Sequence, residues 1–514
     1  MTVSFSGYKT FNILYSSDAH AQPRNMRRFY TVCHDFLKKD RKNKLILLSG
    51  DMNADIAPRP NQLALKIMKM CKVTAAAEGN HELEGGNFWV KYVKKVRPHF
   101  KFLSANLTFT KPNPMEKIIA KSTIIKRKGE KIGIIGISPF DYGKLSFISH
   151  HNDFIKVMNF EETEKAIRKE IELMEKKGIN KICLLAHTGK ASDIGEEYYE
   201  KLSKIGGVKI IIGGHDHKKF DKWYRSERDE PVKVISVGCE EGEKVKDFNL
   251  DSFGTFKAVF DDKNNLVPEM CNNRVEKLEN YPESKKVLRM EEKHLQTKKF
   301  ISNTDIDLTS KNPLAEENPT ASLAADAMMW IVNKETKGKK AQIAFVNSGC
   351  VRTQIPKGQI TVGQVSQAFP FVSYTLIKTD LTKQQIFDTL NWCVESTTLP
   401  KVSPGVMQVG GMKYTIDSNN KVKNVYLINH DGSLGEKLDD QANDKKYSVI
   451  HDQFLLTGVA GLKDLKKDYN NPDIEYFPYT RQDAVIKYLK ENFHNKPVEV
   501  KTGRIEVEPY NSVY

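Results

Sequence analysis

The stretch VKIIIGGHDH, residues 208–217, indicates the fold more clearly than any other part of the chain. Its β-branched run predicts a buried strand, and two glycines and two histidines follow that run directly. Four other segments repeat the arrangement, in which an apolar run ends and Asp, His or Asn follows at once. They are LYSSDAH (14–20), LLSGD (47–51), EGNHE (78–82) and LLAH (184–187). The pattern predicts several strands with polar side chains at their carboxyl ends.

Helical and strand-like segments alternate around these five stretches. Residues 24–39, 62–72 and 160–178 have the apolar spacing of amphipathic helices, and the last of them ends at Gly178. Further strand-like runs lie at 44–50, 101–107, 131–138 and 232–238. Alternation of this kind predicts an α/β domain with largely buried strands.

A change in composition marks the end of this first domain. Residues 273–300 are dense in charge and helix-prone, so we expect a helical connector there. Beyond it, helical segments at 318–333 and 384–396 lie among β-rich runs, and Asn318 can cap the first helix. The predicted organisation is an α/β domain, a helical connector and a smaller α+β domain. Their residue ranges are 1–272, 273–310 and 311–514.

The composition is that of a folded protein with a basic surface. Of 514 residues, 39% are hydrophobic and 28% charged, and 80 Lys and Arg against 65 Asp and Glu leave a net charge of +15. No apolar run reaches the ~20 residues that a membrane helix needs. Seven cysteines without a CxxC pair argue against a disulfide framework and a Cys-built zinc site. No classical signal peptide is seen, so we expect a cytoplasmic protein, with non-classical export left open.

The polar residues that follow the predicted strands suit a two-metal site. Ligand sites in open α/β sheets gather at the carboxyl ends of strands, so these residues are expected to converge. Asp18 and His20 are two positions apart and would share one side of an extended segment, as would His215 and His217. Mixed imidazole and carboxylate ligands suit Mn, Zn, Fe or Co. Two such cations about 3.5–4 Å apart would clamp phosphoryl oxygens and acidify a bridging water.

Each segment alone is explained as well by an ordinary turn or helix cap. A single histidine, too, is more often a structural side chain than a ligand. The joint occurrence of all five, each after a predicted strand, favours a shared metal site.

Together the segments resemble the signature of the calcineurin-like metallophosphoesterase superfamily. LLSGDMNAD, GNHELEG, FLSANL, IGIIGIS and LLAHTG are further similar to the amino-terminal domain of the 5′-nucleotidase family. SLAADAM, VNSGCVRTQIPKGQITVGQVSQAFPF and FLLTGVAG look like its carboxy-terminal, substrate-recognising domain. The resemblance implies a metallophosphoesterase α/β sandwich with a 5′-nucleotidase-like second domain. It also implies hydrolysis of a phosphate ester, a nucleotide or a related small phosphoester, by a hydroxide that bridges two divalent cations.

The resemblance assigns roles to individual residues. One cation would be held by Asp18, His20, Asp51 and His217. The other would be held by Asp51, Asn80, His187 and His215, with Asp51 bridging the two. His81 would act on the phosphate rather than ligate, oriented by Glu84, where relatives usually carry Asp. Asp216 would point away from the metals.

The second domain departs from the family pattern. Phe371 and Phe454 match the two positions that stack on the base, and Arg352 matches one arginine that holds phosphate. Ser373 replaces the usual Asn, and Ala460 replaces the Asp that grips ribose. SGC (348–350) stands in place of GGG, and AEENPTASL lacks further arginines. We therefore expect a working phosphohydrolase with a shifted or relaxed substrate preference.

Two alternatives remain at this stage. The charge of +15 is compatible with a nucleic-acid phosphodiesterase, although Lys and Arg are spread along the chain rather than concentrated. A non-enzymatic binding protein on the same fold is the other alternative, and the presence of all seven ligand positions argues against it. The oligomeric state is left unpredicted.

Overall fold

The structure is a computed structural model of the chain, and contacts divide it into two compact units, Met1–Glu291 and Glu292–Tyr514. The boundary lies inside the predicted connector segment 273–310. The structure describes residues 7–20, 23–38, 42–53, 58–84, 86–140, 155–188, 195–238, 251–312, 314–371, 374–396, 405–456 and 473–508.

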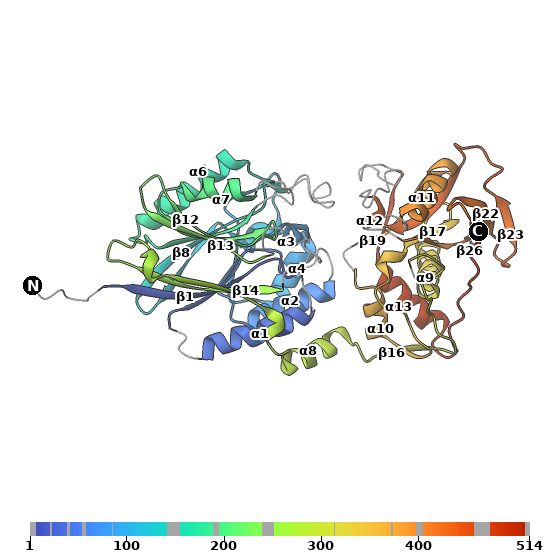
Figure 1. The fold of residues 1–514 in the computed structure, drawn as a ribbon, viewed down its shortest axis with the longest axis horizontal. Helices are drawn as coiled ribbons and strands as arrows, with labels where there is room; N and C mark the ends of the chain where they lie inside the picture. Colours follow the sequence, from blue (N-terminus) through green and yellow to red (C-terminus); the bar gives the residue numbers. More distant parts are fainter. Residues whose placement is uncertain are drawn as a thin grey trace, which may run out of the picture. The chain divides into compact units, whose positions relative to one another are not determined.

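The first unit contains two large β-sheets (Figure 1). The seven-stranded sheet has the order β15-β14-β1-β2-β3-β4-β6, and the six-stranded sheet has the order β12-β13-β11-β10-β8-β7. The strands of the first sheet are β1 (Lys9–Ser16), β2 (Lys44–Leu48), β3 (Ala75–Ala77), β4 (Lys101–Leu103), β6 (Ile119–Ala120), β14 (Ser252–Phe260) and β15 (Asn272–Lys277). Those of the second are β7 (Ser122–Arg127), β8 (Glu130–Ile137), β10 (Ile182–Thr188), β11 (Val208–His215), β12 (Phe220–Arg225) and β13 (Pro231–Ser236). The central strands of both sheets pair in parallel, within the α/β domain that the alternation predicted.

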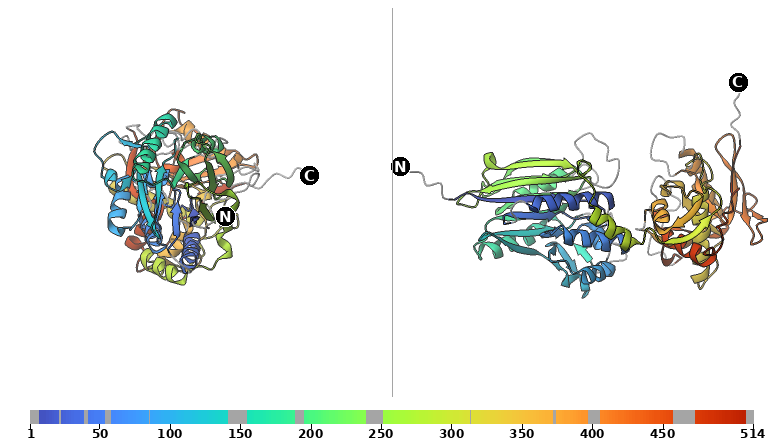
Figure 2. Two further views of the ribbon diagram at one scale, coloured as in Figure 1. Left: turned by 90° about the vertical axis from the view of Figure 1, so that its left-hand side faces the viewer. Right: turned by 90° about the horizontal axis from the view of Figure 1, so that it is seen from below.

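The two sheets enclose a common apolar core, and helices cover their outer faces. Ile13 and Tyr15 of the first sheet pack into one cluster with Leu185 and Ile212 of the second. Leu14 lies between Ile13 and Tyr15 in the sequence, points to the opposite face of the sheet and is also fully buried. Outside lie α1 (Pro23–Lys38), α2 (Pro58–Met70), α4 (Gly86–Val96), α6 (Phe160–Glu175) and α7 (Gly195–Ser203) (Figures 1 and 2). Burial on both faces explains why the strands read as continuous apolar runs.

One part of the predicted connector differs from expectation. Residues 273–277 belong to β15, which pairs antiparallel with β14 at the edge of the first sheet, so they are strand rather than helix. Val275 lies opposite Gly254 and packs against the core, so strand pairing outweighs the helical propensity of this charged segment. Helix α8 (Lys285–Leu295) follows, and strand β16 (Phe300–Thr304) comes after it. The connector is therefore helical only in its middle.

The second unit is a separate α+β domain built on a five-stranded sheet. Its order is β20-β17-β24-β19-β25, and a four-stranded sheet, β23-β22-β21-β26, accompanies it. The strands of the larger sheet are β17 (Ile343–Asn347), β19 (Thr375–Thr382), β20 (Met407–Gly410), β24 (Lys446–Asp452) and β25 (Glu475–Thr480). Those of the smaller sheet are β21 (Met412–Ile416), β22 (Val422–Ile428), β23 (Leu434–Lys437) and β26 (Ile505–Val507). Helices α9 (Pro319–Glu335) and α13 (Arg481–Asn492) share one core with the sheet, and α11 (Lys383–Ser396) shares another.

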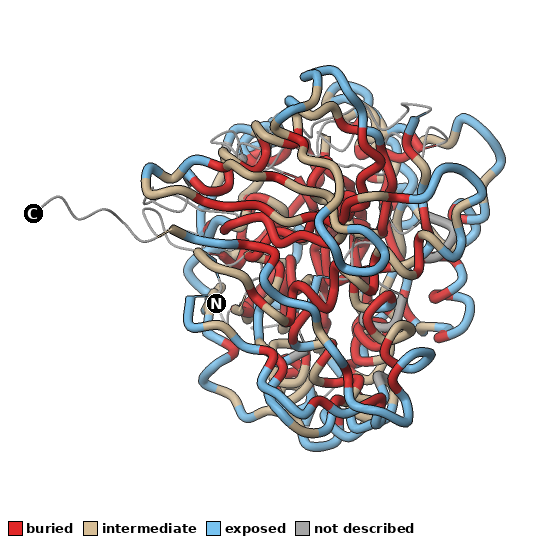
Figure 3. Tube along the Cα trace, turned by 90° about the vertical axis from the view of Figure 1, so that its right-hand side faces the viewer, coloured by how far each residue is buried: buried red, intermediate tan, exposed pale blue. Residues whose placement is uncertain are grey.

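Local capping sets where the long helices begin. Asn318 caps α9 by accepting a hydrogen bond from the backbone N–H of Thr320, as predicted. Asn159 and Glu162 form a capping box at the start of α6. Figure 3 shows buried residues along the inner parts of the trace, with exposed residues mostly on the loops around them. Among the described residues, no helix has the length and apolar content to cross a membrane.

Replacement of Leu185 by Ala tests the shared core of the two sheets. The side chain is fully buried between them, so its truncation is expected to lower the free energy of unfolding by about 2–5 kcal/mol. Denaturant unfolding of the full chain measures this. The matched control is Ile124→Ala on β7, which is 39% exposed and should change stability by about 0.5 kcal/mol or less. Equal effects of the two substitutions would contradict the enclosed core.

Candidate metal centre

The predicted ligands of the first unit converge at one edge, where the strands of both sheets end. Asp18 and His20 follow β1, Asp51 follows β2, and Asn80 begins helix α3 (Asn80–Glu84) after β3. His187 and His215 lie at the ends of β10 and β11, and His217 comes two residues later. The two sheets are joined here, since Ser49 Oγ donates to the carbonyl of Ile212 (2.7 Å).

Five of these residues have left-handed backbone conformations. The φ angles are 51° at Asp18, 43° at His20, 50° at Asp51, 87° at His215 and 56° at His217. Such conformations are uncommon for residues other than glycine and are concentrated at functional sites. The left-handed backbone conformations at Asp18 and His20 therefore bring their two side chains into one group. The extended geometry expected from the sequence was wrong for this segment and for 215–217.

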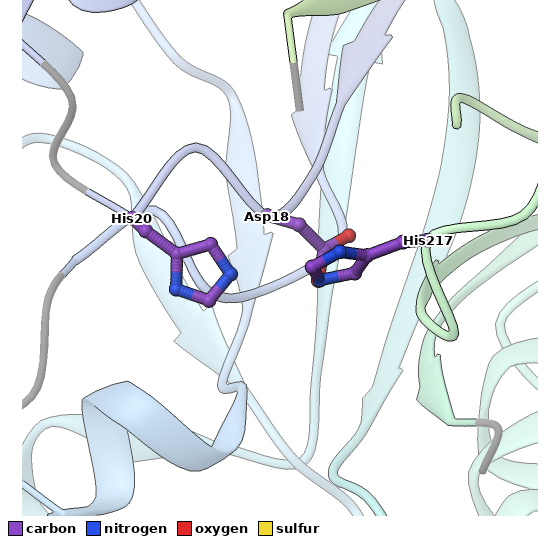
Figure 4. A group of neighbouring side chains, drawn as sticks. All are labelled: Asp18, His20 and His217. Atoms are coloured by element: carbon purple, nitrogen blue, oxygen red, sulfur yellow. The ribbon is translucent and has the colours of Figure 1, made fainter. Parts of the chain in front are cut away.

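The first group of side chains is Asp18, His20 and His217, whose ligand atoms lie within 4.8 Å of one another. His217 Nε2 is 3.5 Å from Asp18 Oδ1, and the His20 and His217 rings are 5.6 Å apart. Figure 4 shows the Asp18 carboxylate against the His217 ring, with His20 beside them. Asp18 also accepts a hydrogen bond from the backbone N–H of His215 (3.0 Å), which connects this group to the second.

The second group is Asp51, His187 and His215, again within 4.8 Å. His187 Nε2 is 3.1 Å from Asp51 Oδ2, and the His187 and His215 rings are 4.9 Å apart. Asp51 also forms a third group with His20 and His81, so it shares a group with a ligand predicted for each of the two metals.

The residues present fit divalent cations. Among the side chains that the structure describes, His20 Nε2 and Asn80 Oδ1 are buried polar atoms with no hydrogen-bond partner. Unpartnered buried polar atoms are rare, and imidazole nitrogen and amide oxygen are ligands that divalent metals accept. Gly50 has φ 93°, and a Cβ there would lie 2.4 Å from His187 Nδ1. A Cβ at Gly79 would lie 2.1 Å from Asp51 Oδ1, so both glycines leave room for the ligands.

The electrostatics keep the carboxylates ionised. Burial opposes ionisation of Asp18, but the nearby histidines, His217 first, together outweigh it and lower the pKa of Asp18 to about 2. Burial also opposes ionisation of Asp51, but His187, His81 and His20 together hold its pKa well below the usual value. Burial lowers the pKa of His20 to about 3, so its ring is neutral near pH 7. Ionised carboxylates and a neutral imidazole are the forms that bind metals.

Glu82 is a structural part of the site that the sequence analysis missed. Its carboxylate is buried and accepts five hydrogen bonds. Oε2 accepts from the backbone N–H groups of Asp51 and Gly79, both at 2.9 Å. Oε1 accepts from the backbone N–H groups of Met52 and Asn53 and from Asn53 Nδ2, at 2.9–3.1 Å. Glu82 thereby joins the corner that carries Asp51 to the turn that carries Asn80.

The sequence does contain a signal for Glu82. A Glu at the third position of a helix can accept a hydrogen bond from the backbone N–H of the residue just before the helix. Gly79 precedes α3, and Glu82 occupies this position. Burial and repulsion from Asp51 raise the pKa of Glu82 to about 7.

The residues predicted to act on the phosphate lie at the start of α3. The His81 side chain is 24% exposed, and its Nε2 is 3.9 Å from Asp51 Oδ2. Its ring is 4.7 Å from that of His20. The side chain of Glu84, its predicted partner, lies outside the described residues. Asp216 is buried and accepts from the backbone N–H of Lys218 (3.2 Å), and it belongs to none of the three ligand groups.

The predicted substrate residues lie in the second unit. The Arg352 guanidinium carbon is 4.9 Å from the centre of the Phe371 ring, which is 42% exposed. Phe454 lies in the short helix α12 (Gln453–Leu456), and its ring is 5.4 Å from that of Tyr374. Ser373 and Ala460, where the chain departs from the family pattern, lie outside the described residues.

Comparison with known families matches each unit separately. Residues 11–219 match the calcineurin-like phosphoesterase family, and residues 295–467 match the C-terminal domain of 5′-nucleotidases.

Among curated proteins, the trifunctional nucleotide phosphoesterase YfkN of Bacillus subtilis is 26% identical over 97% of this chain. The chain spans about a third (35%) of the length of that protein. The 5′-nucleotidase of Vibrio vulnificus is 25% identical over 74% of this chain and 73% of its own. The solved 5′-nucleotidase precursor of Thermus thermophilus has the same fold, with a TM-score of 0.56 and 24% identity. That alignment covers 98% of this chain and 100% of the other.

Replacement of Glu82 by Gln tests its role in the metal centre. The amide oxygen can replace one carboxylate oxygen, but the amide NH₂ then faces backbone N–H donors. We expect Mn²⁺ affinity to fall about 10–100-fold, as is typical when a partner of metal ligands is lost. Isothermal titration with Mn²⁺ measures this, and Glu172→Gln on the exposed face of α6 is the control. Unchanged Mn²⁺ affinity in Glu82→Gln would contradict the role.

Proposed function

We propose that this chain, a calcineurin-like phosphoesterase domain followed by a 5′-nucleotidase C-terminal domain, hydrolyses phosphate esters of nucleotides or related small molecules with divalent metals. The observation that carries the proposal is the convergence of six of the seven predicted ligands, Asp51 among them, in three neighbouring groups, with Asn80 at the start of α3. Asp51 is a member of two of the three ligand groups, and Asp18 connects the remaining group through the His215 backbone. A binding protein would not need this arrangement of ligands.

The roles of the side chains follow from where they lie. Asp18, His20 and His217 would hold one cation, and Asp51 would contribute to both positions. His187, His215 and Asn80 would complete the second. Two divalent cations bound there supply the charge that stabilises phosphoryl oxygens and acidifies water. Mn, Zn, Fe or Co suits this mixture of ligands.

His81 is proposed to act on the substrate. Its side chain is partly exposed and lies beside both His20 and Asp51. From there the imidazole can donate a proton to the leaving oxygen or stabilise negative charge on the phosphate. Its backbone N–H donates to Asp51 Oδ1 (3.0 Å), which ties the position of His81 to the bridging carboxylate.

Nucleotides are the proposed substrate class because of the second unit. Arg352 stacks on the exposed ring of Phe371, a pairing that presents an aromatic face and a cation together. A base and its phosphate need these two features. The relatives named above include 5′-nucleotidases, which supports the same class.

A hydrolysis panel tests the proposed function. The full chain is assayed with AMP and a generic aryl phosphate by release of inorganic phosphate, and with a sugar nucleotide, a cyclic nucleotide and single-stranded DNA by chromatography of the phosphomonoester products. We expect turnover of at least one mononucleotide, loss of turnover with a chelator, and recovery when Mn²⁺ is added. No turnover of any substrate would refute the proposal. Cleavage of single-stranded DNA alone would favour the nucleic-acid phosphodiesterase instead.

Paired substitutions separate metal binding from proton transfer. Asp51→Ala is expected to abolish turnover and to lower the metal content, because it removes the shared ligand. His81→Ala is expected to lower kcat by about 10²–10⁴-fold, the usual loss for a general acid, with the metal content unchanged. Elemental analysis and kcat measurements on the two variants check this. Equal loss of metal in both would show that His81 is a ligand.

Replacement of Phe371 by Ala tests nucleotide recognition. Loss of a stacking ring costs about 1–3 kcal/mol, so KM for AMP is expected to rise about 5–150-fold. An aryl phosphate, which carries no nucleobase, should keep its KM. Steady-state kinetics on both substrates measure the difference. An equal change for both substrates would contradict a specific role in base binding.

A further inference from the structure

One tyrosine hydroxyl lies between the two strands that carry His187 and His215. Tyr199, on helix α7, is fully buried. Its hydroxyl is 3.0 Å from the carbonyl oxygen of Thr188 and 3.2 Å from that of Gly214. It also accepts a hydrogen bond from the backbone N–H of Gly214 (3.1 Å). Both contacted residues are direct neighbours of a predicted ligand in the sequence.

The strand pairing is irregular at this point. β10 and β11 pair in parallel, but their register shifts at the carboxyl ends. Gly214 lies opposite both His187 and Thr188, and Thr188 also lies opposite His215. An irregularity of this kind interrupts the ladder of hydrogen bonds and redirects side chains. The Tyr199 hydroxyl supplies a donor and an acceptor to the backbone at this interruption.

Packing holds the hydroxyl in place. The Tyr199 ring contacts the Phe220 ring edge to face, with centroids 5.1 Å apart. On the strand side, Gly213 lets the backbone approach, since a Cβ there would lie 2.3 Å from the tyrosine oxygen. The hydroxyl therefore reaches the two strand ends from a rigid position in the core between α7 and the sheet.

We propose that Tyr199 is a positioning residue that fixes the backbone corner of His187 and His215, and thereby the geometry of one cation site. The inference rests on the proposed function, because only a metal site makes use of that geometry. The hydrogen bonds of the Tyr199 hydroxyl go to main-chain atoms of Thr188 and Gly214, so it acts through the main chain. Removal of a group that orients metal ligands typically costs 10–100-fold in metal affinity or activity.

Tyr199→Phe removes the hydroxyl and keeps the ring. In calorimetric titration with Mn²⁺, the wild-type chain is expected to bind two ions. In the variant, one dissociation constant should rise about tenfold or more, and the other should stay within about twofold. Activity should fall at limiting Mn²⁺ and recover in excess Mn²⁺, which a general loss of structure would not allow. Tyr414→Phe in the second unit, equally buried and bonded to the carbonyl of Met407 (2.8 Å), is the matched control.

A double substitution makes the test specific to this corner. In a His215→Ala background, Tyr199→Phe should add little further loss of Mn²⁺ affinity, because the two residues act on the same site. Full additivity, unchanged Mn²⁺ binding in Tyr199→Phe, or unfolding of that variant would each overturn the inference. Failure of the wild-type chain to bind any of Mn²⁺, Zn²⁺, Fe²⁺ and Co²⁺ would instead refute the proposed function itself.

Discussion

The Asp51 carboxylate is the group on which the candidate site depends. One oxygen accepts from the backbone N–H of His81 (3.0 Å), and the other lies 3.1 Å from His187 Nε2. The backbone N–H of Asp51 is in turn held by Glu82 (2.9 Å). The buried Asp51 carboxylate, which follows β2 of the first sheet, therefore contacts His187 of the second sheet and the backbone of His81 in α3. Displacement of Asp51 would remove the carboxylate that the second and third ligand groups share.

The sandwich makes this meeting possible because both sheets end at the same edge. Ser49 is the direct connection: its hydroxyl donates to a carbonyl of β11, and its own carbonyl lies 2.6 Å from His187 Nδ1. That second contact leaves Nε2 of His187 directed toward Asp51. Secondary contacts of this type fix the ring orientation of metal-binding histidines. The first unit thus supplies both the ligands and the groups that orient them.

Much of the fold and of the candidate site could be predicted from the sequence. The features that could not be predicted have physical causes. Apolar runs that end in Asp, His or Asn mark strand ends, so the convergence of Asp18, Asp51 and His187 could be predicted. Their roles in binding and catalysis stay predictions. Left-handed corners could not be foreseen, because the residues at those corners are not glycine. Tyr199 acts through backbone atoms and has no residue-type pattern, and the strand nature of 273–277 depends on a distant partner strand.

The place of β1 in its sheet has a consequence for biosynthesis. β1 lies between β2 and β14, and the Tyr15 hydroxyl donates to Asn273, 258 residues later in the chain (2.9 Å). Pairings so distant in sequence form slowly, because a long loop must close first. On the ribosome, the segment that carries Asp18 and His20 must wait until β14 and β15 have emerged. The nascent first domain therefore cannot complete its sheet until nearly all of its residues have been synthesised.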